Sequence, residues 1–433
     1  MADIRPFRGT FYNPQVVEDL ARAIAPPYDV IDEKKRNVLL SRSPYNIARL
    51  ILPQPGGDAD FWNNAATLFR AWKKGGVLAC DGAQCFYVYR QTYALPASGE
   101  VSRTGMLALL RCRDFSSGEI LPHERTFPRT RAERLNLLRA CRANFSQIFT
   151  VFRDREEEVL PLLEEAAAQP CFMEVTDDEG VRHRVWRLEA GDGAERLKAS
   201  LRGKKLIIAD GHHRYETALA YSGEKHATAS EAHAAAYVSV VLFRSEDPGL
   251  AVLPVHRVLR RLTLTPEEAC RRLERYFHVE ALRGDATSRA GMLGDRLASS
   301  RRPAFVMATA AGVALLSLRE GVEPEGILGG PESAEWKNLD ISVLHSLVLE
   351  ECLGLDSSVL AENGDLYFTP WESAAMSALS EGEAEAAFIV RPTRMDEIWD
   401  IAEGGERMPH KSSYFYPKLA SGLTIYDHEN ALS

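Results

Sequence analysis

Several features that define common protein classes are absent from this sequence. None of the seven cysteines belongs to a Cys-x-x-Cys pair, and their number is odd. Neither a disulfide framework nor a zinc site is therefore indicated. No run of eighteen or more apolar residues occurs, and the first residues contain no apolar signal-peptide core. We expect a cytoplasmic protein that has no membrane partner.

An excess of positive charge is missing as well. The chain has 52 Lys and Arg against 61 Asp and Glu, a net charge of −9. Broad nucleic-acid binding requires a basic face, so the acidic balance argues against nucleic acid as a partner, while leaving room for a local basic cleft. The sequence also has no Gly-x-x-x-x-Gly-Lys-Ser/Thr loop, no kinase-type glycine loop and no Gly-x-Ser-x-Gly elbow. A phosphate site in this chain must use another architecture.

One stretch that is present suits such a site. Residues 206–220 change from an apolar strand-like run to helix-forming composition, with Gly211 at the turn. A helix that starts after such a turn offers backbone N–H groups and the positive end of its dipole to an anion. Three side chains at the turn add further donors: His212, His213 and Arg214. Asp210 precedes the glycine and offers a carboxylate to a magnesium ion or a substrate hydroxyl. The alternative is an ordinary Asp-Gly turn with a capping aspartate.

A second motif, His123-Glu124, follows a proline in an extended segment. The proline disfavours helix, so the pair is expected to be presented by a strand end or loop. A glutamate that is partly buried beside a cation is a plausible general base for a hydroxyl. An exposed glutamate that pairs with Arg125 is the simpler alternative.

Two further places carry candidate cations. The segment 407–418 places Lys411 and Lys418 among serines and tyrosines, where a lysine can close over a phosphate, or can simply be solvated on a strand. His256-Arg257 is a weaker candidate of the same kind. The rigid loop Ala25-Pro-Pro-Tyr-Asp29 holds its tyrosine and aspartate in fixed directions. It is either a plain corner or part of a binding site.

A metal-hydrolase interpretation uses the same histidines and carboxylates as zinc or iron ligands. The residue types are suitable, but their spacing matches no helix-borne pattern such as His-Glu-x-x-His. Bound transition metal in the purified protein would support this alternative.

Hydrophobic periodicity predicts alternating helices and strands along the chain. The helices expected from composition and spacing are 61–74, 131–140, 155–168, 266–277, 341–353 and 394–402. The expected strands are 85–93, 147–152, 181–188, 235–243, 304–309, 313–318 and 386–390, with a loop over 253–257. Length suggests two or three domains, and we place boundaries near residues 115 and 260.

The motifs in their order resemble a known family. Arg8-Gly9, the loop at 25–31, Pro122-His-Glu124, residues 209–215, Pro254-x-His-Arg257 and residues 411–418 together are similar to the domain of unknown function DUF1015 over nearly the full length. More distantly, His123-Glu124 followed by Asp-Gly-His-His-Arg resembles the ParB/sulfiredoxin-like fold. That superfamily includes partition nucleotide hydrolases, sulfiredoxins and free-serine kinases.

The resemblance implies a mixed α/β fold. A ParB/sulfiredoxin-like central unit over residues 116–260 lies between a loop-rich α/β region, 1–115, and a C-terminal α/β region, 261–433. Between the two motifs this chain has a longer gap than those relatives, with an insertion around 172–201.

The resemblance also implies a chemistry. The kinase members suggest Glu124 as the base, beside His123, with Asp210 assisting the substrate or a magnesium ion. The phosphates of ATP or ADP would lie against Gly211, His212, His213 and Arg214, with Lys411 or Arg257 as electrostatic helpers. The expected activity is a nucleotide-dependent phosphotransferase for a small hydroxyl compound, with free L-serine favoured. A nucleotide-binding regulatory module of the partition type is the alternative, although no basic helix-turn-helix segment follows the motif.

Overall fold

The structure is a computed structural model that describes residues 2–53, 61–95, 98–224, 226–283, 296–297 and 299–430. It contains two compact units. Unit 1 comprises Met1–Ala251 and Pro417–Ser433, and unit 2 comprises Val252–Tyr416. The expected boundary near residue 115 lies inside unit 1, and the one near residue 260 lies inside unit 2. No helix of the described residues is long and apolar enough to cross a bilayer.

Helices and strands alternate in unit 1, which confirms the prediction of a mixed α/β fold. Its strands are β1 (Ile4–Arg5), β2 (Thr10–Tyr12), β3 (Leu78–Cys80), β4 (Cys85–Leu95), β5 (Gly99–Arg111), β6 (Ile120–Pro122), β7 (Ala143–Asn144), β8 (Ile148–Phe152), β9 (Met173–Thr176), β10 (Arg182–Glu189), β11 (Leu206–Asp210), β12 (Tyr237–Arg244) and β21 (Tyr426–Asp427). Its helices are α1 (Glu33–Arg42), α2 (Ala48–Ile51), α3 (Phe61–Lys74), α4 (Pro128–Cys141), α5 (Leu160–Ala167), α6 (Asp192–Leu201), α7 (His212–Ser222) and α8 (Ala229–Ala235), with short 3-10 turns η1 (Leu20–Arg22), η2 (Tyr28–Val30) and η3 (Phe115–Ser117).

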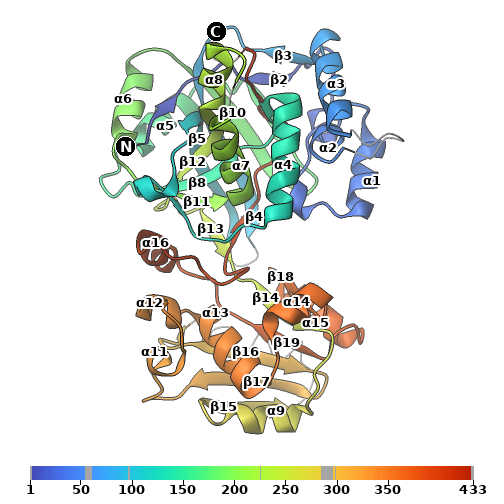
Figure 1. Cartoon of the computed structure of the whole chain (residues 1–433), viewed down its shortest axis with the longest axis vertical. Coiled ribbons are helices and arrows are strands. Elements are labelled where there is room, and N and C mark those ends of the chain that lie inside the picture. The colour runs from blue at the N-terminus through green and yellow to red at the C-terminus, as the bar shows by residue number, and fades with distance from the viewer. Residues whose placement is uncertain are drawn as a thin grey trace. The chain divides into compact units, whose positions relative to one another are not determined.

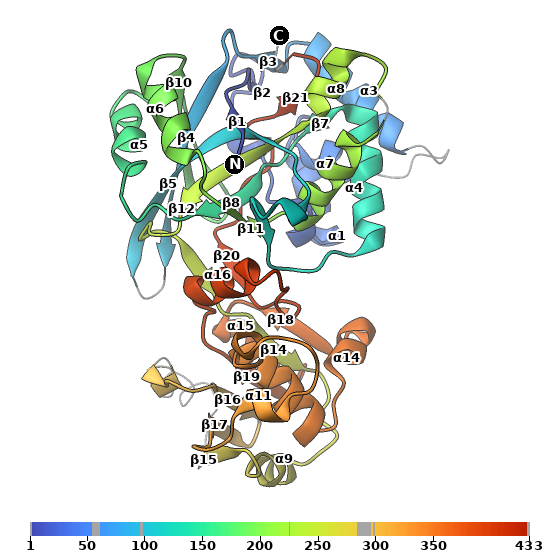
Figure 2. The ribbon, with the colours of Figure 1, turned by 60° about the vertical axis from the view of Figure 1, so that its left-hand side comes forward.

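A 9-stranded sheet forms the centre of unit 1. Its order is β6-β11-β8-β12-β5-β4-β10-β9, with β1 paired to β5. Apolar side chains from β4, β5, β8, β11 and β12 form a buried core with α5, α6 and α7. Figure 1 shows α4 and α7 side by side, and Figure 2 shows α5 beside α6 next to β4 and β10.

The C-terminal residues of the chain belong to this sheet's other face. Leu419 and Leu423 share a small hollow with Leu107 and Val241, which point away from the helices that cover the first face. Strand β21 then pairs with β7. Residues 419–427 are therefore buried in unit 1.

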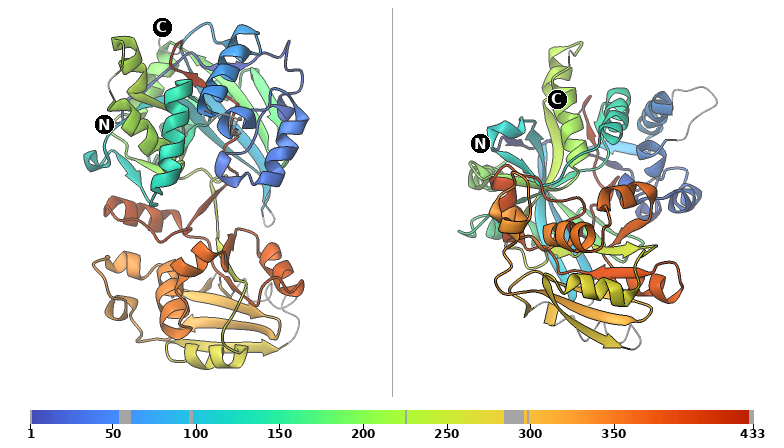
Figure 3. Two further views of the ribbon diagram at one scale, coloured as in Figure 1. Left: turned by 45° about the vertical axis from the view of Figure 1, so that its right-hand side comes forward. Right: turned by 60° about the horizontal axis from the view of Figure 1, so that its bottom comes forward.

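Unit 2 is built on its own sheet. The strands are β13 (Ala251–Leu253), which starts at the last residue before the unit, β14 (His256–Leu259), β15 (Phe277–Arg283), β16 (Ala304–Thr309), β17 (Gly312–Leu318), β18 (Leu366–Thr369), β19 (Ala386–Ile389) and β20 (Tyr414–Tyr416). The helices are α9 (Pro266–Leu273), α11 (Pro324–Ile327), α12 (Ala334–Lys337), α13 (Asp340–Val343), α14 (Ser357–Asn363), α15 (Glu372–Ser380) and α16 (Met395–Glu403), with a π-helical segment η4 (Leu344–Cys352). The 6-stranded sheet has the order β15-β17-β16-β19-β14-β18, and β13 pairs with β20. Figure 3 shows α9 beside β15.

Three predictions made for this unit need correction. The helix expected over 266–277 ends at Leu273, and Phe277 already begins β15. The loop expected over 253–257 is wrong, because β13 ends and β14 begins within it. Pro254 lies in the short break between the two strands. After it, His256 and Arg257 pair with β18, and Arg257 also pairs with β19. The helix expected over 341–353 is present, but its second part is π-helical.

Candidate functional site

Two parallel strands bring the two sequence motifs together. Strand β6 pairs in parallel with β11, with Pro122 opposite Ile208. The carboxyl ends of parallel strands meet at one edge of a sheet, so His123 and Glu124 emerge beside the turn that follows Asp210. His123 is fully buried, and its Nδ1 bonds to the carbonyl oxygen of Ile208 at 2.8 Å.

A bulge shapes the end of β11. Ile208 lies opposite Thr150 of the antiparallel strand β8, whereas Asp210 lies opposite Phe149, so β11 carries one extra residue. Such bulges bend a strand and change the direction of its side chains. Gly211 follows with φ of 95°, and α7 starts at His212.

Asp210 is held between two cations. Its Oδ2 accepts from Nη2 of Arg214 at 2.6 Å, and its Oδ1 accepts from Nζ of Lys418. Burial alone would raise the pKa of Asp210, but Lys418 and Arg214 outweigh burial and bring that pKa down to about 2. The carboxylate is therefore ionised at neutral pH, and the three side chains together carry one net positive charge.

Arg214 lies folded over the glycine turn. Its Nη1 donates to the carbonyl of Gln147, which precedes β8. A Cβ at Gly211 would lie 2.9 Å from Nη2 of Arg214. Among the described residues, Nε of Arg214 is buried and has no acceptor. The Nε–H of this guanidinium is therefore a donor that the described part of the chain does not use.

His212 orients the segment that carries Glu124. Its ring is 4% exposed, and its Nε2 accepts from the backbone N–H of His123 at 3.2 Å and that of Glu124 at 3.4 Å. A neutral imidazole that accepts through Nε2 carries its proton on Nδ1. That Nδ1 lies 3.8 Å from Oε2 of Glu124, whose side chain is 32% exposed. His212 therefore presents an N–H toward a partly open carboxylate.

His213, the second residue of α7, binds the backbone of the same segment. Its Nε2 accepts from the backbone N–H of Phe127 at 2.8 Å, and its ring stacks on that of Phe127. Burial lowers the pKa of His213, although Glu216 and other nearby carboxylates oppose this. Both histidines thus bind backbone groups of residues 123–127 through Nε2, and the cradle role predicted for them remains a prediction.

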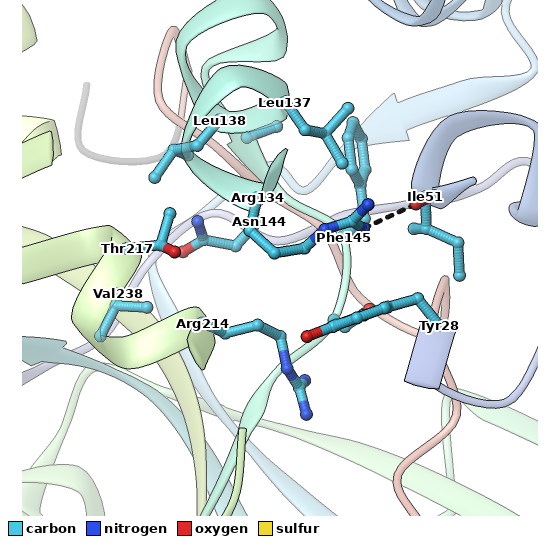
Figure 4. Close-up of a pocket in the computed structure, with 12 residues that line it drawn as sticks. Tyr28, Ile51, Arg134, Leu137, Leu138, Asn144, Phe145, Arg214, Thr217 and Val238 are labelled. Atoms are coloured by element: carbon cyan, nitrogen blue, oxygen red, sulfur yellow. Dashed lines mark hydrogen bonds between the residues drawn. The ribbon is translucent and has the colours of Figure 1, made fainter. Parts of the chain in front are cut away.

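The loop at residues 25–29 also reaches this site. Tyr28 lies in η2, with the guanidinium of Arg134 4.3 Å from the centre of its ring. Burial, followed by the charge of Asp29, raises the pKa of Tyr28 to about 12, against the opposing influence of Arg214 and Arg134. The phenol is therefore protonated at neutral pH. Tyr28, Arg134 and Arg214 line one pocket, which Figure 4 shows.

The backbone of Lys418 is fixed from the interior of unit 1. Gln91 Nε2 donates to the carbonyl of Lys418 at 3.3 Å, and Arg103 donates to the carbonyl of Pro417. Gln91 and Arg103 are both fully buried. The sequence motif at 411–418 indicated a lysine here, but only the fold shows that Lys418 is the one that contacts Asp210.

The predicted helpers Lys411 and Arg257 belong to unit 2. Arg257 is fully buried, and burial lowers its pKa to about 9. Its Nη2 donates to the carbonyl oxygens of His410 at 3.2 Å and Lys411 at 3.0 Å. Arg257 thus fixes the backbone of this segment, and the phosphate-binding role of both residues remains a prediction.

Sequence reasoning left open whether the loop with Tyr28 was a plain corner or part of a binding site, and it did not select Arg134. The two prolines before Tyr28 gave a signal for a fixed direction. Arg134 gave none, because an arginine in an amphipathic helix is normally solvated. Its burial depends on residues from η2 and α2 that are distant in sequence.

A metal ion is the other group that the sequence suggested. In the part of the chain that the structure describes, no three His, Cys, Asp or Glu side chains form a metal-binding group. Magnesium often takes only one or two protein carboxylates and completes its shell with phosphate oxygens and water. Asp210 fits an ion of that kind, which would compete with Lys418 and Arg214 for the carboxylate.

Comparisons with solved structures give distant matches. A free serine kinase in complex with AMP has 13% identity and a TM-score of 0.36, with 72% of this chain and 90% of that chain covered. A conserved hypothetical protein from Pyrococcus furiosus has 14% identity and a TM-score of 0.34, covering 72% and 93%. SbnI with a C-terminal truncation from Staphylococcus aureus has 12% identity and a TM-score of 0.34, covering 72% and 84%. TM-scores this low do not establish a common fold.

Sequence comparison identifies the family. No curated protein matches the chain. A family model described as a protein of unknown function, DUF1015, matches residues 4–342 and therefore spans most of the 433 residues. The chain belongs to the DUF1015 family.

Proposed function

We propose that this chain is a nucleotide-dependent phosphotransferase that acts on a small hydroxyl compound, with free L-serine as the favoured acceptor. One observation carries the proposal. Parallel pairing of β6 and β11 places Glu124 beside a helix start where Arg214 and Lys418 flank Asp210. A base next to a cation-rich turn is the arrangement that phosphoryl transfer to a hydroxyl needs. We expect the reaction in the cytoplasm.

The turn supplies the groups that would hold ATP or ADP. The first N–H groups of a helix have no acceptor within the helix and favour phosphate oxygens. In α7 these are the backbone N–H groups of His212, His213 and Arg214. The side chains of Arg214 and Lys418 add positive charge, and the absent side chain of Gly211 lets a phosphate approach the backbone. The nucleotide would supply the phosphoryl group.

Glu124 has the position expected of the base. Its carboxylate is partly exposed and can reach a substrate, while the backbone N–H of Glu124 is fixed by His212. The Nδ1–H of His212 lies on the carboxylate side of the ring and would stabilise the ionised form of Glu124. In this mechanism Glu124 accepts the hydroxyl proton as the hydroxyl oxygen attacks the terminal phosphorus of the nucleotide. Asp210 keeps Arg214 and Lys418 in place beside the phosphoryl group that is transferred.

Binding and chemistry can be tested separately. Thermal unfolding with ATP, ADP, CTP, AMP or pyrophosphate, each with and without magnesium, reports binding. A ligand at a hundred times its dissociation constant stabilises the fold by about 2.7 kcal/mol. Transfer is measured as phosphoserine formed from L-serine and each binding nucleotide. We expect Glu124→Gln to keep the thermal shift and to lower kcat by roughly 10²- to 10⁴-fold, the usual contribution of a general base.

Glu133→Gln is the matched control, because Glu133 lies on α4 and its carboxylate pairs with the exposed Arg129. It should leave both readouts unchanged. The proposal is wrong if no nucleotide shifts the unfolding temperature, or if Glu124→Gln and Glu133→Gln have the same kcat.

A further inference from the structure

An exposed aromatic ring lies beside the candidate site. Phe127 is 52% exposed, more than any other large apolar side chain in the part of the chain that the structure describes. We propose that its ring stacks on the base of the bound nucleotide, which makes the phosphoryl donor a nucleotide and not an inorganic phosphate chain. This role rests on the proposed function, because the base belongs to the donor of that reaction.

Helix stability does not explain a phenylalanine at this position. Phe127 is the N-cap residue of α4, and Pro128 follows it at the start of the helix. Serine, threonine, aspartate and asparagine are preferred at an N-cap, because their side-chain oxygen accepts an N–H of the first turn. A phenyl ring cannot accept that bond, and a ring left half in water forgoes much of the gain from burial. Single exposed apolar residues are common on protein surfaces, so the exposure has weight only together with this position.

The ring of Phe127 is held in a fixed orientation. The backbone N–H of Phe127 donates to Nε2 of His213 at 2.8 Å, and its carbonyl oxygen accepts from the N–H of Arg131 at 3.1 Å. The ring lies nearly parallel to the imidazole of His213, with 6.0 Å between the ring centres and 19° between the planes. Because His213 belongs to α7, the helix that begins at the turn also orients this ring. A group that is fixed before binding loses little conformational entropy when a ligand arrives.

Phe127 lies next to both parts of the proposed mechanism. Its ring contacts His213, whose backbone N–H is one of the donors at the start of α7. It also follows Glu124 by three residues, in a segment whose backbone His212 and His213 bind. A nucleotide whose phosphates lie at the helix start can therefore reach the ring with its base.

An aromatic ring beside an anion site suits a ligand that has both a flat base and a charged tail. Every nucleobase has a π-face, so stacking on an aromatic side chain strengthens binding whatever the base is. Pyrophosphate and inorganic polyphosphate have no such face and gain nothing from the ring. The ring of Phe127 therefore separates nucleotides from inorganic phosphates, and it does not by itself select the base.

The test compares ADP with pyrophosphate in calorimetric binding to the full chain. Phe127→Ser should weaken ADP binding by roughly fivefold or more, the lower end of what one stacked base contributes, and should leave pyrophosphate binding unchanged. Phe127→Trp keeps an aromatic face and should bind ADP about as tightly as wild type. Val38→Ser, which replaces another half-exposed apolar side chain on α1, is the control and should change neither affinity.

Thermal unfolding without ligand shows whether the variants are folded. Because serine can cap α4, Phe127→Ser should unfold at the same temperature as wild type or at a higher one. A weaker ADP affinity in this variant then reports the lost ring and not a lost fold.

Unchanged ADP binding in Phe127→Ser, or an equal loss of ADP and pyrophosphate binding, would overturn the stacking role and leave the phosphotransferase proposal in place. Loss of ADP binding in Phe127→Trp as large as in Phe127→Ser would also overturn the stacking role. If ADP binding depends on Phe127 but no phosphoserine forms from L-serine, the stacking role stands and the phosphotransferase proposal fails. If wild type binds pyrophosphate but no nucleotide, both fail.

Discussion

At the scale of the residue, Gly211 satisfies two requirements at once. Its φ of 95° lies where residues with a side chain are strained, and the guanidinium of Arg214 occupies the space that a Cβ would need. The strand, the helix start and the Asp210–Arg214 pair all meet at this position. A substitution here therefore tests whether the turn itself holds the site together.

We predict that Gly211→Ala lowers the free energy of unfolding by about 1–3 kcal/mol, the usual cost of holding a residue in a strained backbone region. It should also weaken nucleotide and anion binding, because the new methyl group displaces Arg214. Urea unfolding and thermal shift measure the two effects. Gly223→Ala is the control, since Gly223 ends the same helix with φ of −84° and its nearest atom to a Cβ is 3.5 Å away. Equal losses in both variants would contradict the prediction.

The residues of the site differ in how far the sequence could predict them. Asp210 to Arg214 form a local pattern of strand, glycine turn and helix, and local patterns are visible in a sequence. Lys418 contacts Asp210 from 208 positions away. Arg134 is buried by Tyr28 and Ile51, which are also distant. Such contacts depend on strand order and on the path of the chain, neither of which periodicity contains.

At the scale of the element, strong periodicity gave accurate bounds. The helix expected over 61–74 is α3, and the strand expected over 181–188 is β10 with bounds shifted by one residue. Two expected helices are shorter than predicted, since α5 begins only at Leu160 and α9 ends at Leu273. Another error lies where polar residues are buried. His256 and Arg257 looked like loop residues, yet they lie in β14 with neighbouring strands on both sides. Their burial is possible because His256 accepts from the backbone N–H of Val390, and Arg257 donates to the backbone carbonyls of His410 and Lys411. These partners are distant in sequence, so no local pattern reveals them.

Buried His256 makes the stability of unit 2 depend on pH. Burial, followed by the charge of Arg257, lowers its pKa to about 4, and its Nδ1 accepts from the N–H of Val390 at 3.2 Å. The unfolded chain takes up the proton near pH 6.5, before the folded chain does. The contribution to stability is therefore complete above about pH 6.5, falls as the pH drops, and levels off below about pH 4.

We predict a loss on the order of 3 kcal/mol across this range, since each pH unit of difference is worth about 1.36 kcal/mol. His256→Asn keeps an acceptor but has no titrating ring, so it should lose less stability between pH 7.5 and 4.5. The measurement is urea-dependent amide exchange of the β14 segment, read by mass spectrometry. His278→Asn, an exposed histidine on β15, is the control and should behave like wild type. A pH dependence unchanged by His256→Asn would show that other groups cause it.

At the scale of the whole molecule, the chain leaves unit 1 after Ala251 and returns to it at Pro417. The returning segment supplies Lys418 to the site, the fully buried Ile425 and Tyr426, and the strand β21. Unit 2 is one continuous segment with hydrophobic clusters of its own. The two ends of that segment are close, because β13 and β20 are neighbouring strands, and such strands lie about 4.8 Å apart.

These facts predict that unit 1 needs the returning segment but not the inserted one. Replacing 252–416 by a short Gly-Ser linker should give a folded protein that retains the Asp210–Lys418 pair and binds L-serine as the full chain does. The fragment 1–251 alone should unfold at a lower temperature, because β7 loses its partner and buried apolar surface becomes exposed. Lys418→Met in the linked variant separates the contribution of the returning segment to folding from its contribution to the site. The fold should remain, and Asp210 should lose one of its two cations. Thermal unfolding and calorimetric binding of the three proteins check this, and a fragment 1–251 as stable as the linked variant would refute it.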